Sequence, residues 1–156
     1  MLEGARGDTL PHTFSKNYVN MIFSTKDRRK TITKELQPPL WAYLAGIAKN
    51  HDMTIVVVGG TEDHLHILFH LPPKLALAKA VLLLKSNSSK WINEAGTDFA
   101  WQEGYGAFSV STSNLDSVVR YIRNQEKHHR KFTFEQEFRA ILRRHGLEYD
   151  PRDSLN

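Results

Sequence analysis

The stretch MTIVVVGGTEDHLHILFHLPP, residues 53–73, contains two apolar runs separated by a short polar segment. The first run is rich in β-branched residues and ends at a Gly pair, and the second ends at a Pro pair. Such runs on either side of a short connection predict an antiparallel β-hairpin with strands over 53–60 and 64–71. Two histidines, His64 and His66, lie inside the second strand, where they either face solvent or bind something.

The hairpin lies within a longer alternation of strands and helices. The first six elements follow the β-α-β-β-α-β order of a ferredoxin-like (RRM-like) fold. The predicted fold class is therefore α+β, an antiparallel sheet backed by helices, with two additional C-terminal helices of which the first carries Tyr121. Apolar periodicity and turn residues predict the elements around the hairpin as a strand over 17–25, helices over 35–50 and 74–91, a strand over 106–113, and helices over 114–129 and 134–145.

The chain is expected to form one domain over residues 14–150, after a flexible leader at 1–13 and before a tail at 151–156. No second core or linker is visible between these limits. The ferredoxin-like fold serves RNA-binding modules, metal binders and enzymes alike, so the fold class alone does not give the function.

The composition is ordinary for a soluble globular protein, with 40% hydrophobic and 24% charged residues. No apolar run approaches the ~18 residues that a membrane span needs, and residues 1–14 lack the apolar core of a signal peptide. We therefore expect no membrane partner. The absence of cysteine excludes disulfides, thiolate metal sites and cysteine nucleophiles, and it agrees with a cytoplasmic location.

Positive charge is concentrated in two segments of the chain. The net charge is +4, yet residues 120–144 alone hold eight Lys or Arg against three Glu, a balance of +5. A second basic segment, KDRRKTITK, covers residues 26–34. Clusters of this kind indicate a polyanionic partner, most often nucleic acid, although many charge runs are only solvated helix faces.

The alternation of side chains along a strand places His64 and His66 on the same face of the sheet. If helices pack on the other face, both imidazoles lie on the open face, where their spacing suits one metal ion. Taken alone, His-x-His is more often a pair of ordinary histidines than a metal site. The pair therefore needs a second group of residues before it indicates chemistry.

Tyr121 and Gln125 supply such a group, because residues four apart on a helix lie on one face. A Gln oxygen with two imidazoles forms a mixed ligand set that suits Mg²⁺ or Mn²⁺ better than structural Zn²⁺. A Tyr hydroxyl beside such an ion is a candidate nucleophile that needs activation, since its ordinary pKa is about 10. The alternative is a tyrosine packed between helix and sheet.

Four segments, taken in order, closely resemble the single-tyrosine HUH transposases: GGTEDHLHILFHLPP, LKSNSSKWINE, FAWQEGYGAFSVS and YIRNQEKHHRK. These are the small TnpA-type transposases of the two-hundred-type bacterial insertion sequences, and they include the REP-associated tyrosine transposases. HUH denotes His, a hydrophobic residue and His, which His64-Leu65-His66 fits. The family's Tyr with Gln four residues later fits Tyr121 and Gln125, and the resemblance runs over residues 12–150.

The resemblance implies a DNA transposase that acts on single-stranded DNA near hairpin ends. His64, His66 and Gln125 would hold Mg²⁺ or Mn²⁺ at the scissile phosphate. Tyr121 would attack the phosphorus and form a 5′-phosphotyrosine, leaving a free 3′-hydroxyl. The covalent link conserves the phosphodiester energy, so no nucleotide cofactor is expected, and Gly59-Gly60 is expected to be a turn instead of a phosphate-binding loop. The resemblance also implies a bacterial, nucleoid-associated homodimer, with the tyrosine used in cis or in trans.

Charge and aromatic residues predict where DNA binds. Lys85 is a candidate for stabilising the transition-state charge. Trp91 and Trp101 either stack on unpaired bases or belong to the core, and His128 and His129 either contact phosphate or extend the basic surface. The predicted phosphate contacts are Lys26, Arg28, Arg29, Lys85, Lys90, Arg120, Arg123, Arg130 and Lys131.

Two other functions fit parts of the sequence. A non-catalytic single-strand-binding module explains the basic clusters and aromatics, but not the joint occurrence of two histidines, Tyr121 and Gln125. A metal phosphoesterase that uses water needs the histidines but not the tyrosine. Replacing Tyr121 with Phe separates all three functions, because only the transposase forms a covalent bond with DNA.

Overall fold

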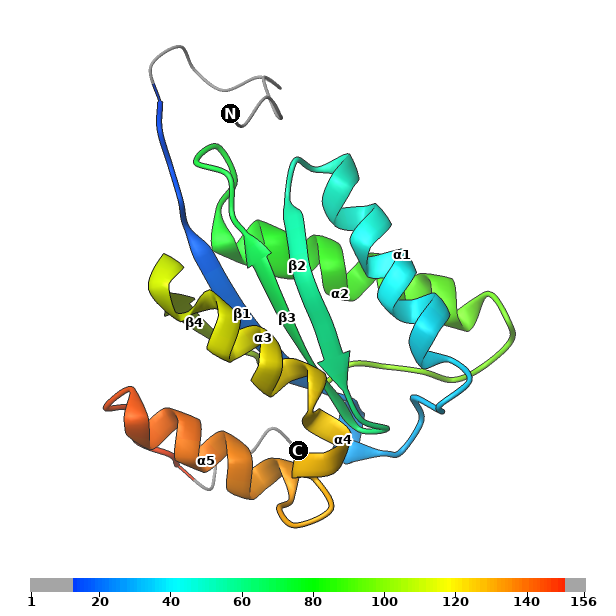
Figure 1. The fold of residues 1–156 in the computed structure, drawn as a ribbon. Coiled ribbons are helices and arrows are strands. Elements are labelled where there is room, and N and C mark those ends of the chain that lie inside the picture. Colours follow the sequence, from blue (N-terminus) through cyan, green and yellow to red (C-terminus); the bar gives the residue numbers. More distant parts are fainter. Residues whose placement is uncertain (1–12, 151–156) are drawn as a thin grey trace.

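The computed structural model describes residues 13–150, whose centre is a four-stranded antiparallel sheet (Figure 1). The strand order is β2-β3-β1-β4, so β1 pairs with both β3 and β4. This arrangement confirms the predicted hairpin and the predicted α+β fold class. The strands are β1 (Tyr18–Ser24), β2 (Thr54–Gly60), β3 (His64–His70) and β4 (Gly106–Val110).

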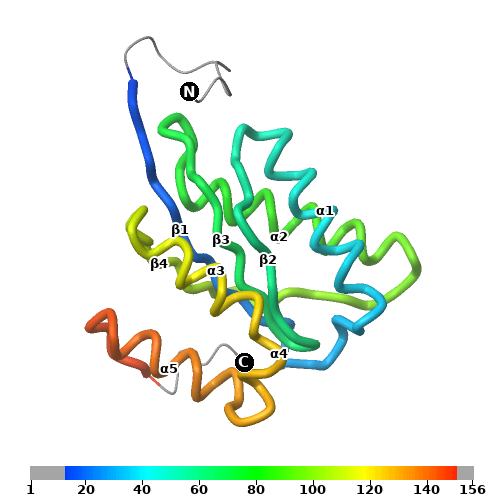
Figure 2. The backbone as a smooth tube through the Cα atoms, in the orientation of Figure 1, coloured from blue at the N-terminus to red at the C-terminus, as the bar shows by residue number. Residues whose placement is uncertain are grey.

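Helices cover both faces of this sheet (Figure 2). On one face, α1 (Gln37–Asn50) and α2 (Leu77–Asn93) pack on alternate residues of β1 and β3, including Phe23, Ile67 and Phe69. The opposite face carries two smaller apolar clusters around Ile22 and Leu68. The helices on that opposite face are α3 (Leu115–Arg123), α4 (Gln125–His128) and α5 (Phe134–Arg144).

The opposite face was expected to be open around the two histidines, and that prediction is wrong. His64 and His66 are both 0% exposed. Ile122 of α3 packs on Leu68, while Phe134 and Phe138 of α5 pack with residues of the same sheet face. The apolar clusters that these helices form on the sheet therefore bury both imidazoles.

The predicted helix over 114–129 divides at Asn124, which has φ −96° and ψ 17°. Its backbone N–H is shared between the carbonyl oxygens of Arg120 and Tyr121, both at 3.2 Å. Asn is a weak helix former because its amide competes for backbone hydrogen bonds. Because of this break, α3 ends at Arg123 and α4 starts at Gln125. Tyr121 and Gln125 therefore lie on separate helices.

Other boundaries move by a few residues for local reasons. The helix predicted from residue 74 starts at Leu77, and Leu75 N–H bonds Pro72 O in the turn before it. The strand predicted to reach residue 113 ends at Val110, because Thr112–Asn114 form a 3₁₀ turn, η2. A second 3₁₀ turn, η1, covers Lys26–Arg28.

Both tryptophans that were weighed as base-stacking residues pack within the protein. Trp101 is 9% exposed, and its Nε1 donates to Ser88 Oγ at 2.9 Å. The Trp91 ring stacks on Tyr43 with centroids 4.6 Å apart. Within residues 13–150, no helix is long and apolar enough to cross a membrane. The tail at 151–156 and residues 1–12 of the predicted leader lie outside the described residues.

Candidate catalytic site

His64 is held in a fixed orientation by the turn that precedes β3. Its Nδ1 lies 2.7 Å from Asp63 Oδ1 and 3.0 Å from Thr61 Oγ1, and Thr61 donates to the same carboxylate at 2.9 Å. Burial opposes ionisation of Asp63, but hydrogen bonds from His64 and Thr61 lower the pKa of its carboxyl. An ionised carboxylate only accepts, so the His64 Nδ1 carries a proton and donates it. The Nε2 atom then faces the interior of the site.

Gln125 is the first residue of α4, and it contacts one histidine on β3 and another that follows α4. Its Oε1 lies 3.0 Å from His64 Nε2 and 3.0 Å from His129 Nε2. Its Nε2 donates to Glu137 Oε2 at 3.1 Å. Gln125 is 1% exposed, so all of these contacts are made away from bulk water.

Tyr121 of α3 points at the same carboxylate, and its hydroxyl donates a hydrogen bond to Glu137 Oε2. The Tyr121 ring also meets the His66 ring edge-on, with centroids 5.9 Å apart. Burial raises the pKa of Tyr121, and the hydrogen bond to Glu137 and the negative charge there raise it further. The hydroxyl is therefore held protonated in this arrangement.

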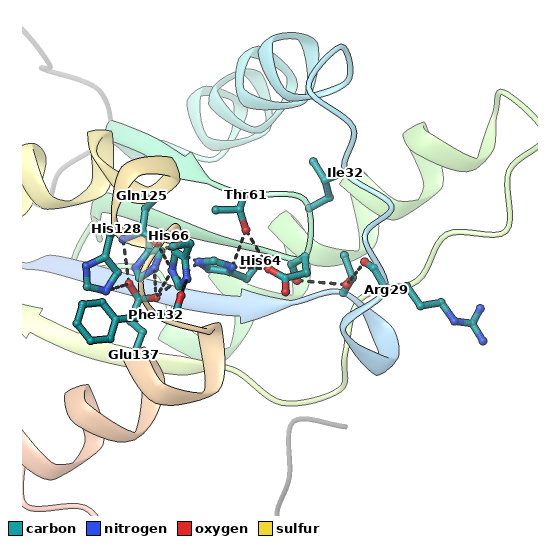
Figure 3. A network of polar contacts seen from close by, with 12 residues as sticks. Arg29, Ile32, Thr61, His64, His66, Gln125, His128, Phe132 and Glu137 are labelled. Carbon is teal, nitrogen blue, oxygen red and sulfur yellow. Dashed lines mark hydrogen bonds and ion pairs between the residues drawn. The ribbon is translucent and has the colours of Figure 1, made fainter.

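Glu137 is the centre of this network, as Figure 3 shows. Its side chain is 1% exposed, with Oε1 3.0 Å from His66 Nε2 and 3.2 Å from His129 Nε2. Its Oε2 lies 3.4 Å from His128 Nε2. Burial by itself raises the pKa of Glu137, but the hydrogen bonds from His129 and His66 outweigh burial and hold the pKa well below its ordinary value. Glu137 is therefore a buried, ionised carboxylate.

The pKa values of His66 and His129, two imidazoles beside Glu137 Oε1, shift in opposite directions. Burial lowers the pKa of the fully buried His66, and Glu137 only partly offsets it. Burial also opposes charge on His129, but the hydrogen bond to Glu137 raises its pKa above the ordinary value. His129 and His128 had been interpreted as phosphate contacts or as part of a basic surface, yet both face Glu137.

Sequence reasoning missed Glu137 altogether, although a signal was present. Residues 134, 137, 138 and 141 follow helical spacing, and three of them are the apolar Phe134, Phe138 and Ile141. Glu137 is the one charged residue on this inward face of α5. A carboxylate on an otherwise apolar helix face is seldom buried without a partner, so the pattern already indicated a functional or ion-paired group.

The chain matches the family model described as "Transposase IS200 like" over residues 13–125. It belongs to the IS200-like transposase family. The transposases of insertion sequence element IS200 from Salmonella typhimurium and Salmonella typhi are each 25% identical to it over 125 residues. These matches cover 75% of this chain and 82% of each relative. The resemblance to these transposases is thereby confirmed, and DNA transposition is the function that the family implies.

Solved structures show the same fold. A candidate transposase from Deinococcus radiodurans R1 matches with a TM-score of 0.62 and 22% identity, over 76% of this chain and 97% of its own. A REP-associated tyrosine transposase bound to a REP hairpin matches with a TM-score of 0.55 and 14% identity, over 74% of this chain and 70% of its own. The family match ends at Gln125, so α5 and Glu137 lie beyond it.

Two clefts reach the site of this IS200-like transposase. One is lined by Tyr121 together with Asn114, Ser117 and Arg144. The other passes His129 and Asp63 and is bordered by Lys30, Lys34, Arg130 and Lys131. Both clefts therefore combine site residues with positive charge.

The residues predicted to bind DNA differ in their surroundings. Arg28 pairs with Glu135 at 3.2 Å. The Lys85 ammonium donates to three backbone carbonyls of residues 102–104, and burial lowers its pKa. Lys85 thus holds a loop, and its contact with DNA stays a prediction. The remaining predicted residues are exposed: Lys26, Arg29, Lys90, Arg120, Arg123, Arg130 and Lys131.

The start of α5, about one helical turn before Glu137, is fixed by a capping box at Thr133. The Thr133 Oγ1 accepts from Gln136 N–H at 3.2 Å, and Gln136 Oε1 accepts from Thr133 N–H at 2.9 Å. We expect Thr133→Ala to lower the free energy of unfolding by about 1 kcal/mol, because the Gln136 N–H loses the hydroxyl oxygen that accepts its hydrogen bond. Thermal or urea unfolding measures this loss. Thr133→Ser keeps the hydroxyl and should remain close to wild type, and equal losses in both variants would contradict the capping role.

Proposed function

We propose that this transposase cuts and rejoins single-stranded DNA near hairpins through a 5′-phosphotyrosine formed by Tyr121. The observation that carries the proposal is the meeting of Tyr121, Gln125 and the histidine pair at one buried carboxylate. A structural tyrosine between helix and sheet does not require two imidazoles and an amide on the carboxylate that its hydroxyl contacts. Tyr121 and the histidine pair of the same chain meet at Glu137, which is the arrangement that use of the tyrosine in cis requires.

His64, His66 and Gln125 are the proposed ligands of Mg²⁺ or Mn²⁺. The donor set fits a divalent ion, because His64 donates from Nδ1 to Asp63 and turns Nε2, the atom that would coordinate the ion, toward Gln125 Oε1 at 3.0 Å. A nitrogen and an oxygen at that distance are joined either by a proton or by a cation that both coordinate. When bound, such an ion would polarise the scissile phosphate and neutralise part of its charge.

The chain's own residues supply the covalent step. The Tyr121 oxygen forms a bond to phosphorus, and the bond from phosphorus to the 3′ oxygen breaks. The proton lost by Tyr121 is balanced by the proton that the 3′ oxygen gains as it leaves as a hydroxyl. Glu137 holds the hydroxyl of Tyr121 before reaction, and its charge disfavours the phenolate, so this contact has to loosen or be neutralised before attack. Reversal with a new 3′-hydroxyl rejoins DNA without a nucleotide cofactor.

DNA would approach through the two clefts, where backbone phosphates meet Arg144 on one side and Lys30, Lys34, Arg130 and Lys131 on the other. The other predicted phosphate contacts lie on the surface around them. Homodimer formation and association with the bacterial nucleoid remain proposals that rest on the family.

The deciding experiment mixes the protein with labelled single-stranded oligonucleotides from the hairpin flanks of its own gene, with Mn²⁺ or with EDTA. We expect a metal-dependent adduct on a denaturing gel that carries the 3′ portion of the DNA, as a 5′-phosphotyrosine requires. Cleaved DNA without an adduct would instead favour hydrolysis by water. Binding without cleavage across a series of flanking sequences would favour a single-strand-binding module.

A further inference from the structure

His129 and Glu137 are not among the metal ligands proposed above, yet both lie beside the proposed ligand His64. Ligand atoms of His64, His129 and Glu137 all lie within 4.8 Å of one another. His129 follows α4 and Glu137 lies on α5, so both come after the segment that matches the family model. Their side chains are nearly enclosed, at 10% and 1% exposed.

The hydrogen bonds behind the two imidazoles orient them in the same way. His129 Nδ1 lies 2.7 Å from the carbonyl oxygen of Phe132, and His64 Nδ1 lies 2.7 Å from the Asp63 carboxylate. Both partners only accept, so each Nδ1 donates and each Nε2 faces inward. Metal-binding histidines have this arrangement, in which the other ring nitrogen donates to a carboxylate or a backbone carbonyl.

The atoms that these Nε2 nitrogens face are oxygens. Gln125 Oε1 lies 3.0 Å from both His64 and His129, and Glu137 Oε1 lies 3.2 Å from His129 and 3.6 Å from His64. A proton on each nitrogen or a shared divalent cation are the two ways to join these atoms. A cation replaces such protons when it binds, because imidazole coordinates in its neutral form.

We propose that His129 and Glu137 are direct ligands of the metal ion and complete its site together with His64, His66 and Gln125. The inference rests on the proposed metal-assisted function and extends it to the C-terminal helix. Three imidazoles with a carboxylate and an amide oxygen form a mixed set for a divalent ion such as Mn²⁺. His66 Nε2 lies 3.0 Å from Glu137 Oε1, the same oxygen that His129 and His64 face, so the three imidazoles and the carboxylate meet at one place.

This ligand set ties α5 to the catalytic centre. Apart from Glu137, α5 is held to the sheet by Phe134, Phe138 and Ile141. Ion binding at Glu137 would therefore stabilise the docked position of α5, because a ligand that binds only the folded arrangement raises its stability. We expect Mn²⁺ to raise the melting temperature of wild type, and to raise it less in Glu137→Gln.

Isothermal titration of MnCl₂ into the full chain tests the assignment without DNA or activity. Glu137→Gln keeps the shape of the side chain but removes its charge, and we expect it to weaken Mn²⁺ binding by at least about tenfold. His129→Asn should weaken binding by a similar factor. Glu135→Gln is the matched control, because it removes the same charge two residues earlier on α5, where Glu135 pairs with Arg28 and Arg139. It should stay within about twofold of wild type.

The direction in which Mn²⁺ affinity changes decides whether Glu137 is a metal ligand. Wild-type or tighter Mn²⁺ affinity in Glu137→Gln would overturn the proposal, because Glu137 would then be only a counter-charge for protonated histidines. Equal weakening in Glu135→Gln would also overturn it. If Glu137→Gln does not fold by circular dichroism, His129→Asn decides the outcome alone, and unchanged affinity there overturns the proposal.

The same titration separates this inference from the proposed function. Adduct formation by wild type, together with unchanged Mn²⁺ affinity in both variants, removes the ligand assignment and leaves the transposase mechanism intact. Weakened Mn²⁺ binding in both variants, without any adduct from wild type, supports the ligands and removes the covalent mechanism.

Discussion

Tyr121→Phe is expected to abolish the covalent protein–DNA adduct and to lower strand cleavage by at least about 1,000-fold. Phe has no oxygen to form the bond to phosphorus, while its ring keeps the edge-on contact with His66. The loss should therefore concern chemistry and not folding. Labelled single-stranded oligonucleotides on a denaturing gel measure the adduct, and fluorescence anisotropy of the same DNA measures binding, which should be retained.

Tyr43→Phe is the matched control for this loss. It removes the same oxygen from a tyrosine on α1, whose ring stacks on Trp91 and lies on the other face of the sheet from the site. Its adduct yield should equal that of wild type. Cleaved product that persists in Tyr121→Phe would identify water as the nucleophile, and a persistent adduct would identify another side chain.

The elements that could be predicted from the sequence are those whose signals are local. The period of two placed His64 and His66 on one face, and β-branched residues before a Gly pair marked the hairpin. Tyr121 and Gln125 were grouped by their spacing of four. That grouping was right about their proximity and wrong about the helix, because Asn124 separates α3 from α4.

The burial of His64 and His66 under helices could not be predicted from local sequence signals. Whether a sheet face is open depends on contacts between residues far apart in the chain, such as Ile122 with Leu68. Glu137 lies 71 residues from His66 in the sequence, yet its Oε1 is 3.0 Å from His66 Nε2. No local pattern pairs these two residues, although the charged position on the inward face of α5 marks Glu137 as unusual. The sequence therefore indicated the two histidines, Tyr121 and Gln125. It did not indicate that Glu137 is the central carboxylate, because that depends on tertiary contacts.

The position of Tyr121 depends on how closely α3 approaches the sheet, and Gly59 sets that approach. Gly59, which was expected to lie in a turn, instead lies on β2 opposite His66. A Cβ added there would lie 2.3 Å from the carbonyl oxygen of Ile122 and 2.9 Å from its Cγ2. Backbone atoms cannot yield as a flexible side chain end does, so the helix itself would have to move.

Gly59→Ala is therefore expected to destabilise the protein by about 2–3 kcal/mol, the cost of overpacking a close contact. Urea unfolding measures this loss. The adduct yield should fall further than the folded fraction does, because Ile122 is the neighbour of Tyr121 and any outward shift of α3 moves the hydroxyl away from the site. Comparing yield per folded molecule separates the two effects.

Gly46→Ala is the control, since it adds the same methyl group to a glycine on α1 with no atom within 4 Å of the new Cβ. Alanine is favoured over glycine inside a helix, so this variant should gain about 0.5–1 kcal/mol and keep its adduct yield. A Gly59→Ala protein as stable and as active as wild type would show that α3 can move away from the sheet without loss. The tyrosine would then reach its phosphate from a mobile helix, and a fixed distance between β2 and α3 would not be what positions it.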